Sequence, residues 1–395
     1  MRVLLFAVAA AALYLFGATP GVVPEVMPAS SLVSELPPWP VYKFFVTLND
    51  VFRYLAEKTT PPSIRALELS HGFWQSVVVY AMVKHGALDV LAEGAARCEF
   101  VAERTQTHPH FMCRFMHAAA TLGILEEPEA GTFRNTKVAV ELRTTRRDIA
   151  LWMSSTLRDP IVATAETSMI TGAPGSVEYY GAPWFEWLGQ NQEESEMFDR
   201  AMKDFSLRTS AAVVAELRLK GDEVICDVGG GIGTLLATIW EHWPSTTVML
   251  FDQPETAKRA ADFLENRGVK NATTVSGSFF DPLDLEACDI IFLKSILHDW
   301  PDDEFVRIVE NIKEGASDGA RLAVVEAIVG ADGPSFERAK AFGDTGIFST
   351  CPTGAKERTL REFTDLFFRA GLLKLNELPT ILKLRDLLSV MIIPL

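Results

Sequence analysis

The sequence predicts an α/β fold in which a mostly parallel, doubly wound sheet follows a helical N-terminal domain. Two observations predict the sheet. A short apolar run, residues 224–228, leads through a glycine cluster into a helical pattern that ends near Trp243, as expected for a buried parallel strand and its crossover helix. Further apolar runs then alternate with helical patterns down the chain, and apolar residues at helical spacing between residues 63 and 123 predict the helical domain.

Residues 1–62 carry no pattern of a folded domain. After Met1 and Arg2, an apolar run covers residues 3–16, which is too short for a comfortable membrane span. A cleaved targeting peptide within residues 1–20, an uncleaved anchor and a helix packed on the body all stay open. The run suggests organelle targeting or a membrane tether. Residues 21–62, rich in Pro, Ser and Val, are predicted to be a linker with a short helix near 46–58.

Residues 63–147 are predicted to form a domain of helices and a small wing. Ser63 is a plausible N-cap for a helix that continues to Gly86, and further helices are expected near residues 88–91, 100–103 and 110–121. Residues 124–134 then suggest a β-hairpin. This is the outline of a winged helix, but a net charge of −15 argues against binding to DNA, so dimerisation is the expected role.

Residues 148–220 are predicted to be a mostly helical connector with many aromatic side chains. Phe198, Met202 and Phe205 fall on one helical face. They can line an apolar acceptor pocket or simply pack in the core, and the pattern alone does not decide between the two.

Residues 221–395 contain the sheet. Further strands are predicted at residues 248–252, 272–275, 289–293 and 321–326. Residues 372–378 and 387–393 are expected to add a closing antiparallel pair, which brings the sheet to seven strands.

The glycine cluster indicates a nucleoside site. Gly229, Gly231 and Gly233 are spaced as G-x-G-x-G, whereas a dinucleotide fingerprint needs G-x-G-x-x-G and fails at Thr234. Asp252 ends the next predicted strand, 23 residues after Gly229, where an acid can accept the ribose hydroxyls. This spacing favours S-adenosylmethionine (SAM) over NAD.

The other polar residues that follow predicted strands are expected at the same edge of the sheet, because ligands of open α/β sheets lie outside the carboxyl ends of the strands. His298 can take a proton near neutral pH, or it can simply start a helix beside Asp302. A metal site at His298 and Asp299 is the weaker alternative. These strand-end residues are Asp227, Ser278, Phe279, Lys294, His298, Asp299, Trp300 and Glu326.

The cysteines show no metal-binding spacing. Cys226 and Cys288 lie in or next to predicted strands, so free, buried thiols are expected there. Free thiols would indicate a reducing compartment and a catalytic body of the cytosolic type. The five cysteines are Cys98, Cys113, Cys226, Cys288 and Cys351.

From about Ala66 to the C-terminus, the chain resembles the metal-independent, SAM-dependent O-methyltransferases that include caffeate, hydroxyindole and bacterial polyketide methyltransferases. The resemblance implies a Rossmann-like class I SAM methyltransferase domain behind a winged-helix dimerisation domain, and hence a homodimer. The matching stretches are residues 227–233 (DVGGGIG), 251–254 (FDQP), 277–280 (GSFF), 292–300 (FLKSILHDW), 325–326 (VE) and 356–359 (KERT).

The resemblance also implies roles for single residues. His298 falls on the general base, and Glu326 and Glu357 fall on the two acids that position it; no metal takes part. Ser278 stands where the family has an Asp at the adenine amine, and Phe205 stands where plant members often have His. The implied cofactor residues are Asp227, Gly229, Gly231, Gly233, Asp252, Ser278, Phe279, Lys294 and Trp300, and the implied acceptor residues are Phe198, Met202, Phe205 and Asp299.

The sequence therefore predicts a methyltransferase that acts on a hydroxyl of a small aromatic or polyketide-like acceptor. Two alternatives stay open. An S-methyltransferase for a small thioether acid would need no base, and a catalytically silent SAM-binding scaffold would not need His298. Membrane contact is expected through residues 3–16 only.

Overall fold

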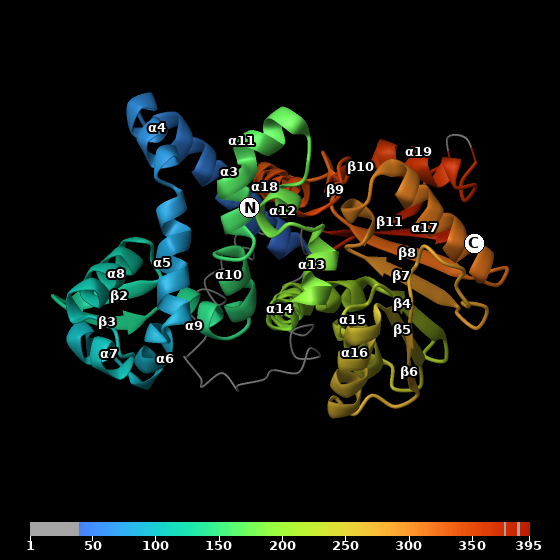
Figure 1. Cartoon of the computed structure of the whole chain (residues 1–395), viewed down its shortest axis with the longest axis horizontal. Helices are drawn as coiled ribbons and strands as arrows, with labels where there is room; N and C mark the ends of the chain where they lie inside the picture. Colours follow the sequence, from blue (N-terminus) through green and yellow to red (C-terminus); the bar gives the residue numbers. More distant parts are fainter. Residues whose placement is uncertain (1–38, 375–376, 385–387) are drawn as a thin grey trace, which may run out of the picture. The chain divides into compact units, whose positions relative to one another are not determined.

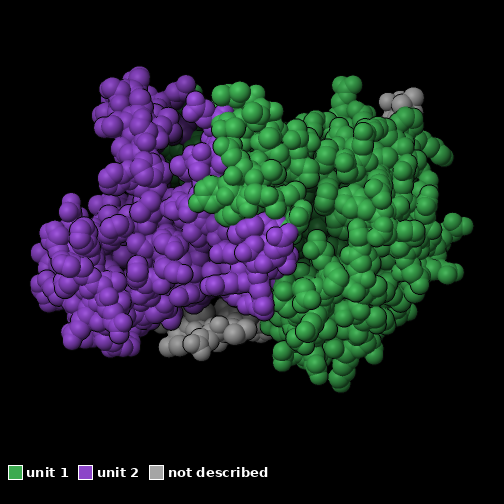
Figure 2. Space-filling model, in the orientation of Figure 1, with its two compact units in different colours: residues 1–55, 167–186, 206–395 green, residues 56–166, 187–205 purple. Residues whose placement is uncertain are grey.

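The structure is a computed structural model that describes residues 39–374, 377–384 and 388–395 (Figure 1). The chain folds into two compact units, which Figure 2 distinguishes by colour. Unit 1 contains the described parts of residues 1–55, 167–186 and 206–395, and unit 2 contains residues 56–166 and 187–205. The helical connector is therefore divided between the units.

Unit 2 holds the predicted helices and wing. A small sheet has the strand order β1-β3-β2, and β2 pairs with β3 in antiparallel fashion, which confirms the predicted hairpin. The core of this unit includes Met82, Leu88, Met116 and Phe133. Its elements are α4 (Pro62–Ser70), α5 (Phe73–Lys84), α6 (Ala87–Val90), η1 (Leu91–Glu93), β1 (Ala96–Arg97), α7 (Cys98–Arg104), α8 (Pro109–Thr121), β2 (Leu125–Glu129), β3 (Thr132–Asn135), α9 (Lys137–Arg143) and α10 (Arg147–Met153).

Further helices connect this region to the sheet of unit 1. The connector is mostly helical, as predicted, and its longest helix contains residues of both units. These helices are α11 (Arg158–Thr171), α12 (Gly175–Tyr180), α13 (Trp184–Gln190) and α14 (Gln192–Glu216).

Unit 1 contains a seven-stranded sheet of order β11-β12-β8-β7-β4-β5-β6, as predicted. Only β12 runs against its neighbours. The elements are β4 (Val224–Val228), α15 (Thr234–His242), β5 (Thr247–Asp252), α16 (Pro254–Asn266), β6 (Ala272–Ser276), β7 (Ile290–Lys294), η2 (Leu297–Asp299), α17 (Asp302–Gly315), β8 (Arg321–Glu326), β9 (Ile328–Val329), α18 (Pro334–Thr350), β10 (Arg358–Thr359), α19 (Leu360–Arg369), β11 (Thr380–Lys383) and β12 (Ser389–Pro394).

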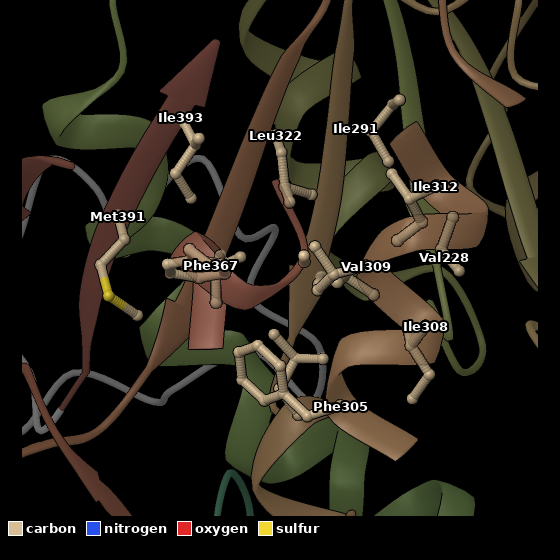
Figure 3. Close-up of a cluster of buried hydrophobic side chains, with 14 of the residues drawn as sticks. Val228, Ile291, Phe305, Ile308, Val309, Ile312, Leu322, Phe367, Met391 and Ile393 are labelled. Atoms are coloured by element: carbon tan, nitrogen blue, oxygen red, sulfur yellow. The ribbon is translucent and has the colours of Figure 1, made fainter. Parts of the chain in front are cut away.

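Helices cover both faces of the sheet. On one face, side chains of α17 and α19 pack against alternate residues of the strands, such as Val228, Ile291 and Leu322 (Figure 3). On the other face, Leu250 and Leu264 lie under the glycine turn that leads into α15. Because successive strand residues point to opposite faces, strands buried on both sides are almost continuously apolar, which explains why they were recognisable in the sequence.

The structure corrects three predicted boundaries. The helix predicted at 46–58 is α3, a longer helix over Trp39–Thr59 that takes up much of the predicted linker. The helix predicted from Ser63 to Gly86 is interrupted at His71 and Gly72, and Pro61, not Ser63, occupies its N-cap.

The first strand of the closing pair was placed too early. It is β11, at Thr380–Lys383, rather than at residues 372–378. The first apolar residues there follow α19, which ends at Arg369: Gly371 turns the chain with a φ of +69°, and Leu373 is buried in the core. A strand and a helix end give the same short apolar run in the sequence.

The prediction of free thiols at Cys226 and Cys288 was wrong. These two cysteines form a disulfide, and so do Cys98 and Cys113, while Cys351 is free and buried. Cys226 lies in β4 and Cys288 just before β7. The sequence does not tell which strands are neighbours, so it could not pair them, and the inference of a reducing compartment loses its basis.

The apolar run at residues 3–16 lies outside the described residues, so its role as a targeting peptide or anchor stays a prediction. No helix in the described part of the chain is both long and apolar enough to span a membrane.

Candidate active site

The candidate site lies where the strand order reverses direction. From β4 the chain proceeds outward through β5 and β6, and it then returns to β7 on the other side of β4. In open α/β sheets such a switch point leaves a crevice at the carboxyl ends of the two central strands. Asp227 and Lys294 belong to the ends of these strands, and the His298 turn follows β7.

The glycine turn after β4 leaves room for a ligand. Gly231 has a φ of +58°, and no atom lies within 4 Å of the place where a Cβ would be. At Gly229 a Cβ would lie 2.4 Å from Cδ1 of Ile296, so the turn and the segment after β7 approach each other too closely for a side chain. Gly233, with a φ of +88°, starts α15.

Asp227 is a buried carboxylate in an unusual state. It is 1% exposed, and neither oxygen has a hydrogen-bond partner among the described residues. Burial raises the pKa of Asp227 to about 7, although the nearby charge of Lys294 opposes this shift. The Lys294 ammonium also donates a hydrogen bond of 2.9 Å to Oγ of Ser206. A buried carboxylate without a partner is costly, which marks this position as a cation-binding candidate.

Asp252 sits at the end of β5, next to the same turn. Its Oδ2 accepts a hydrogen bond of 2.8 Å from the Gly231 amide, and its Oδ1 accepts one of 2.7 Å from the Gln253 amide. The turn and the carboxylate therefore form one structure, with Asp252 fixed beside the open space at Gly231.

Aromatic side chains form the next part of the site. The ring of Trp300 lies edge-on to Phe279 and Phe280, with centroids 5.7 and 4.7 Å apart, and stacks on Phe185 at 6.5 Å. Ser278 is exposed, and its Oγ accepts a hydrogen bond from the Phe280 amide. Ser278 is therefore bonded within its own loop.

His298 lies in a cluster of three carboxylates. Its Nδ1 lies 3.2 Å from Oε1 of Glu357 and 3.4 Å from Oε2 of Glu326, and its Nε2 lies 3.4 Å from Oδ1 of Asp299. The side chain of Glu326 is fully buried, whereas those of His298 and Asp299 are each 18% exposed. The structure thus brings together the base and both acids that the sequence resemblance named.

The charges of this cluster shift its pKa values. Burial alone would lower the pKa of His298, but Glu326, Asp299 and Glu357 together raise it well above its ordinary value. Burial raises the pKa of Glu326 to about 7, against the effect of His298. The cluster therefore holds a proton readily, and the imidazole is its natural carrier.

Ligand atoms of His298, Glu326 and Glu357 also lie within 4.8 Å of one another. One oxygen of Glu326 already accepts hydrogen bonds from the amides of Ile296 and Leu297, which gives this carboxylate a structural use. The expectation of a site without metal stays a prediction.

The predicted acceptor residues Phe198, Met202 and Phe205 belong to unit 2. Phe198 packs edge-on against Trp152, with ring centroids 5.6 Å apart, and Met202 and Phe205 are half-buried. Their role at an acceptor stays a prediction.

Comparison with known proteins agrees with this geometry. Residues 172–373, just over half of the chain, match the O-methyltransferase domain family, and residues 67–145 match the O-methyltransferase dimerisation domain. The chain belongs to the O-methyltransferase family. It is an S-adenosylmethionine-dependent O-methyltransferase with a class I fold.

Individual relatives cover most of this O-methyltransferase. The phenazine O-methyltransferase PhzM of Lysobacter antibioticus is 27% identical over 332 residues, which are 81% of this chain and 94% of the relative. The crystal structure of LaPhzM superposes with a TM-score of 0.77 at 26% identity and covers 85% of this chain and 99% of that one. Human N-acetylserotonin methyltransferase in complex with SAM gives a TM-score of 0.75 at 22% identity, with coverage of 85% and 99%.

The residues of the O-methyltransferase fit SAM, which carries an ammonium and a sulfonium group. The orphaned carboxylate of Asp227 offers a buried partner for a cation, and the open space at Gly231 lies beside Asp252. A nucleoside at this turn would find an acid for its hydroxyls and the aromatic rings of Phe279 and Trp300 nearby. Asp227, Gly231 and Asp252 are the residues that would hold it.

Sequence reasoning missed several residues of the site. Sγ of Cys351 donates a hydrogen bond of 3.2 Å to Asp299, and Asp344 accepts one of 2.7 Å from the Glu357 amide. Arg358 contacts the turn that carries His298. The KERT motif at residues 356–359 could have drawn attention to Arg358, but no pattern pointed to Cys351 or Asp344.

Proposed function

We propose that the protein transfers the methyl group of SAM to a hydroxyl group of a small aromatic acceptor, with His298 as the general base. The observation that carries this proposal is the position of His298. Its imidazole lies within 3.4 Å of Glu326, Glu357 and Asp299, in the turn that follows β7 at the cofactor edge of the sheet.

The chemistry explains why a base is useful here. When bound, SAM supplies a methyl group on a sulfonium, which needs no further activation by the protein. A phenolic hydroxyl has a pKa near 10, so it keeps its proton at neutral pH unless a base removes it. His298 in its neutral form can take this proton, and the carboxylates of Glu326 and Glu357 stabilise the resulting imidazolium.

Two observations support an aromatic acceptor. The relative from Lysobacter antibioticus is named for a phenazine, and the human structure is named for N-acetylserotonin; both compounds contain aromatic rings. Rings of this chain's own Phe185 and Trp300 stack in unit 1.

The match of residues 67–145 to a dimerisation domain supports a homodimer.

The test is the rate of methyl transfer by His298→Ala. With SAM and a panel of small phenols, we expect turnover to fall by about 10²-fold or more, while SAM affinity changes little. His117→Ala is the matched control, because that histidine is 67% exposed and pairs only with Glu127 among the partners seen. Mass spectrometry identifies the methylated product.

The same panel separates the alternatives. Transfer to thioethers that does not depend on His298 would favour the S-methyltransferase. A protein that binds SAM but methylates nothing would favour the silent scaffold. Unchanged turnover of a phenol by His298→Ala would refute base catalysis at this residue.

A further inference from the structure

Arg358 is a completely buried arginine that lies next in sequence to Glu357. Its side chain is 0% exposed, and its guanidinium stacks over Phe305 at 5.1 Å. A charged side chain is almost never fully buried unless it is paired. The partners of Arg358 therefore indicate why it is there.

Those partners are the backbone on both sides of His298. Nη1 donates to the carbonyl of Leu297 at 2.9 Å, and Nη2 donates to the carbonyl of Trp300 at 2.8 Å. Nε and Nη2 also donate to Oδ1 of Asp302, at 3.1 and 2.7 Å, and Nη1 lies 3.5 Å from the Lys356 carbonyl. All three nitrogens of the guanidinium are thus used, as a planar fork of five donors allows.

The turn needs these contacts because its own hydrogen bonds stabilise it only weakly. It is a 3₁₀ helix of three residues, and its internal bonds include one of 3.4 Å from the Trp300 amide to the Leu297 carbonyl. Ser295, just before it, has a φ of +55°, which is strained for a residue with a side chain. Such a short element does not persist by its own hydrogen bonds.

Glu326 and the Arg358 segment both hold the turn. Glu326 accepts hydrogen bonds from the amides of Ile296 and Leu297. The Lys356 amide donates to the His298 carbonyl at 3.0 Å, and Arg358 donates to the carbonyls of the adjoining residues. Arg358 also pairs with Ile328 in the small β9–β10 ladder, two residues beyond Glu326.

We propose that Arg358 is a positioning residue that fixes the His298 imidazole between Glu326 and Glu357. The proposal rests on the proposed role of His298 as the base. Arg358 does not touch the reacting groups. It fixes the position of the turn relative to Glu326 on β8 and to Glu357, the residue next to Arg358 in the sequence. The Arg358 side chain thereby determines the distances between His298 and both acids.

The experiment uses Arg358→Lys, which keeps the charge but presents donors from one point and cannot reach both carbonyls. The protein is saturated with S-adenosylhomocysteine, and the titration of His298 is followed by NMR of labelled histidines, with His298→Gln to assign the signal. We expect the pKa of His298 to fall by about one unit or more, because the carboxylates no longer face the imidazole. Affinity for S-adenosylhomocysteine, measured by calorimetry, should stay within about threefold of the wild type.

Arg369→Lys is the matched control, since Arg369 forms an exposed ion pair with Asp303, at the start of the same helix as Asp302. Arg369→Lys should change neither the pKa of His298 nor the affinity for S-adenosylhomocysteine. An unchanged His298 pKa in Arg358→Lys would overturn the proposal, as would a parallel loss of cofactor affinity, which would indicate a general role in folding.

A second variant covers the case in which Arg358→Lys does not fold. Asp302 is 48% exposed, so Asp302→Ala should fold while it removes the acceptor of two Arg358 donors. A smaller fall of the same pKa is expected, and no fall would again overturn the proposal. The NMR titration of His298 needs no acceptor. Its result is therefore independent of the turnover of His298→Ala, which tests the role of His298 as the base.

Discussion

Among single residues, we propose that Asp227 favours cofactor binding while it destabilises the folded chain without cofactor. Its carboxylate is buried without a hydrogen-bond partner in the described part of the chain. Burial raises its pKa to about 7 from an ordinary value of 3.8. Stability associated with this group is thus fully present below pH 3.8 and is lost as the pH rises through about 7, when the folded protein must hold a buried charge.

Asp227→Asn should therefore have opposite effects on stability and on binding. Without cofactor, we expect the Tm at pH 8 to rise, because no buried charge remains, whereas at pH 4 the change should be small. Affinity for S-adenosylhomocysteine should fall by about tenfold or more, since a charged hydrogen-bond acceptor is lost. Thermal melts at both pH values and calorimetry test this, and unchanged affinity would show that Asp227 does not hold the cofactor.

Much of the site could be predicted residue by residue, for a physical reason. Asp227, Asp252, Lys294 and Glu326 each lie at or next to the end of an apolar strand, so their positions followed from the apolar runs. Arg358 could not be found in this way, because its contacts are to backbone carbonyls 58 and 61 residues earlier in the chain.

Among the elements, α3 contacts the start of α18 through hydrogen bonds and a ring stack. Oδ1 of Asp50 accepts hydrogen bonds from the amide and the hydroxyl of Ser335, the former at 3.0 Å. Tyr42 stacks on Phe336 with centroids 6.4 Å apart. Helix α18 lies in the segment between Glu326 and Glu357, and its Asp344 accepts the Glu357 amide. α3 therefore supports the segment that joins the two acids, although it precedes both regions matched by the family.

Asp50→Ala should destabilise unit 1 by about 1 kcal/mol, the usual net contribution of a hydrogen bond. Arg53→Ala, on an exposed position of the same helix, is the control and should have an effect near zero. Urea unfolding of both variants measures the difference. Equal stability of the two would mean that α3 does not hold α18 in solution.

Elements were predicted best where a buried face repeated regularly. Most of the parallel strands were found because they are apolar almost throughout, although β6, with the sequence ATTVS, is largely exposed. The helix α3 was underestimated because its C-terminal half is exposed, with apolar side chains such as Phe52 and Tyr54 on the surface, so the pattern there is not that of a buried face. The strand misplaced at residues 372–378 contains Leu372 and Leu373, which follow the end of α19 and belong to or pack against the core.

For the whole molecule, the fold class and the family were predictable, but the long-range pairings were not. The disulfide between Cys226 and Cys288 joins positions 62 residues apart, and it became visible only when β4 and β7 proved to be neighbours. The three carboxylates around His298 come together in the same way. Their residues were each recognised in the sequence, whereas their distances are a property of the folded sheet.

The proposed role of His298 as the base of this O-methyltransferase can be measured through the pH dependence of kcat/KM for a phenol. The base must be neutral to work, and its carboxylate neighbours raise its pKa well above 6.5. We expect kcat/KM to rise with pH well beyond 6.5, by about tenfold per pH unit on the acid side, and this limb to be missing in His298→Ala. A wild-type profile that is flat between pH 6 and 8, or a limb that survives in His298→Ala, would contradict it.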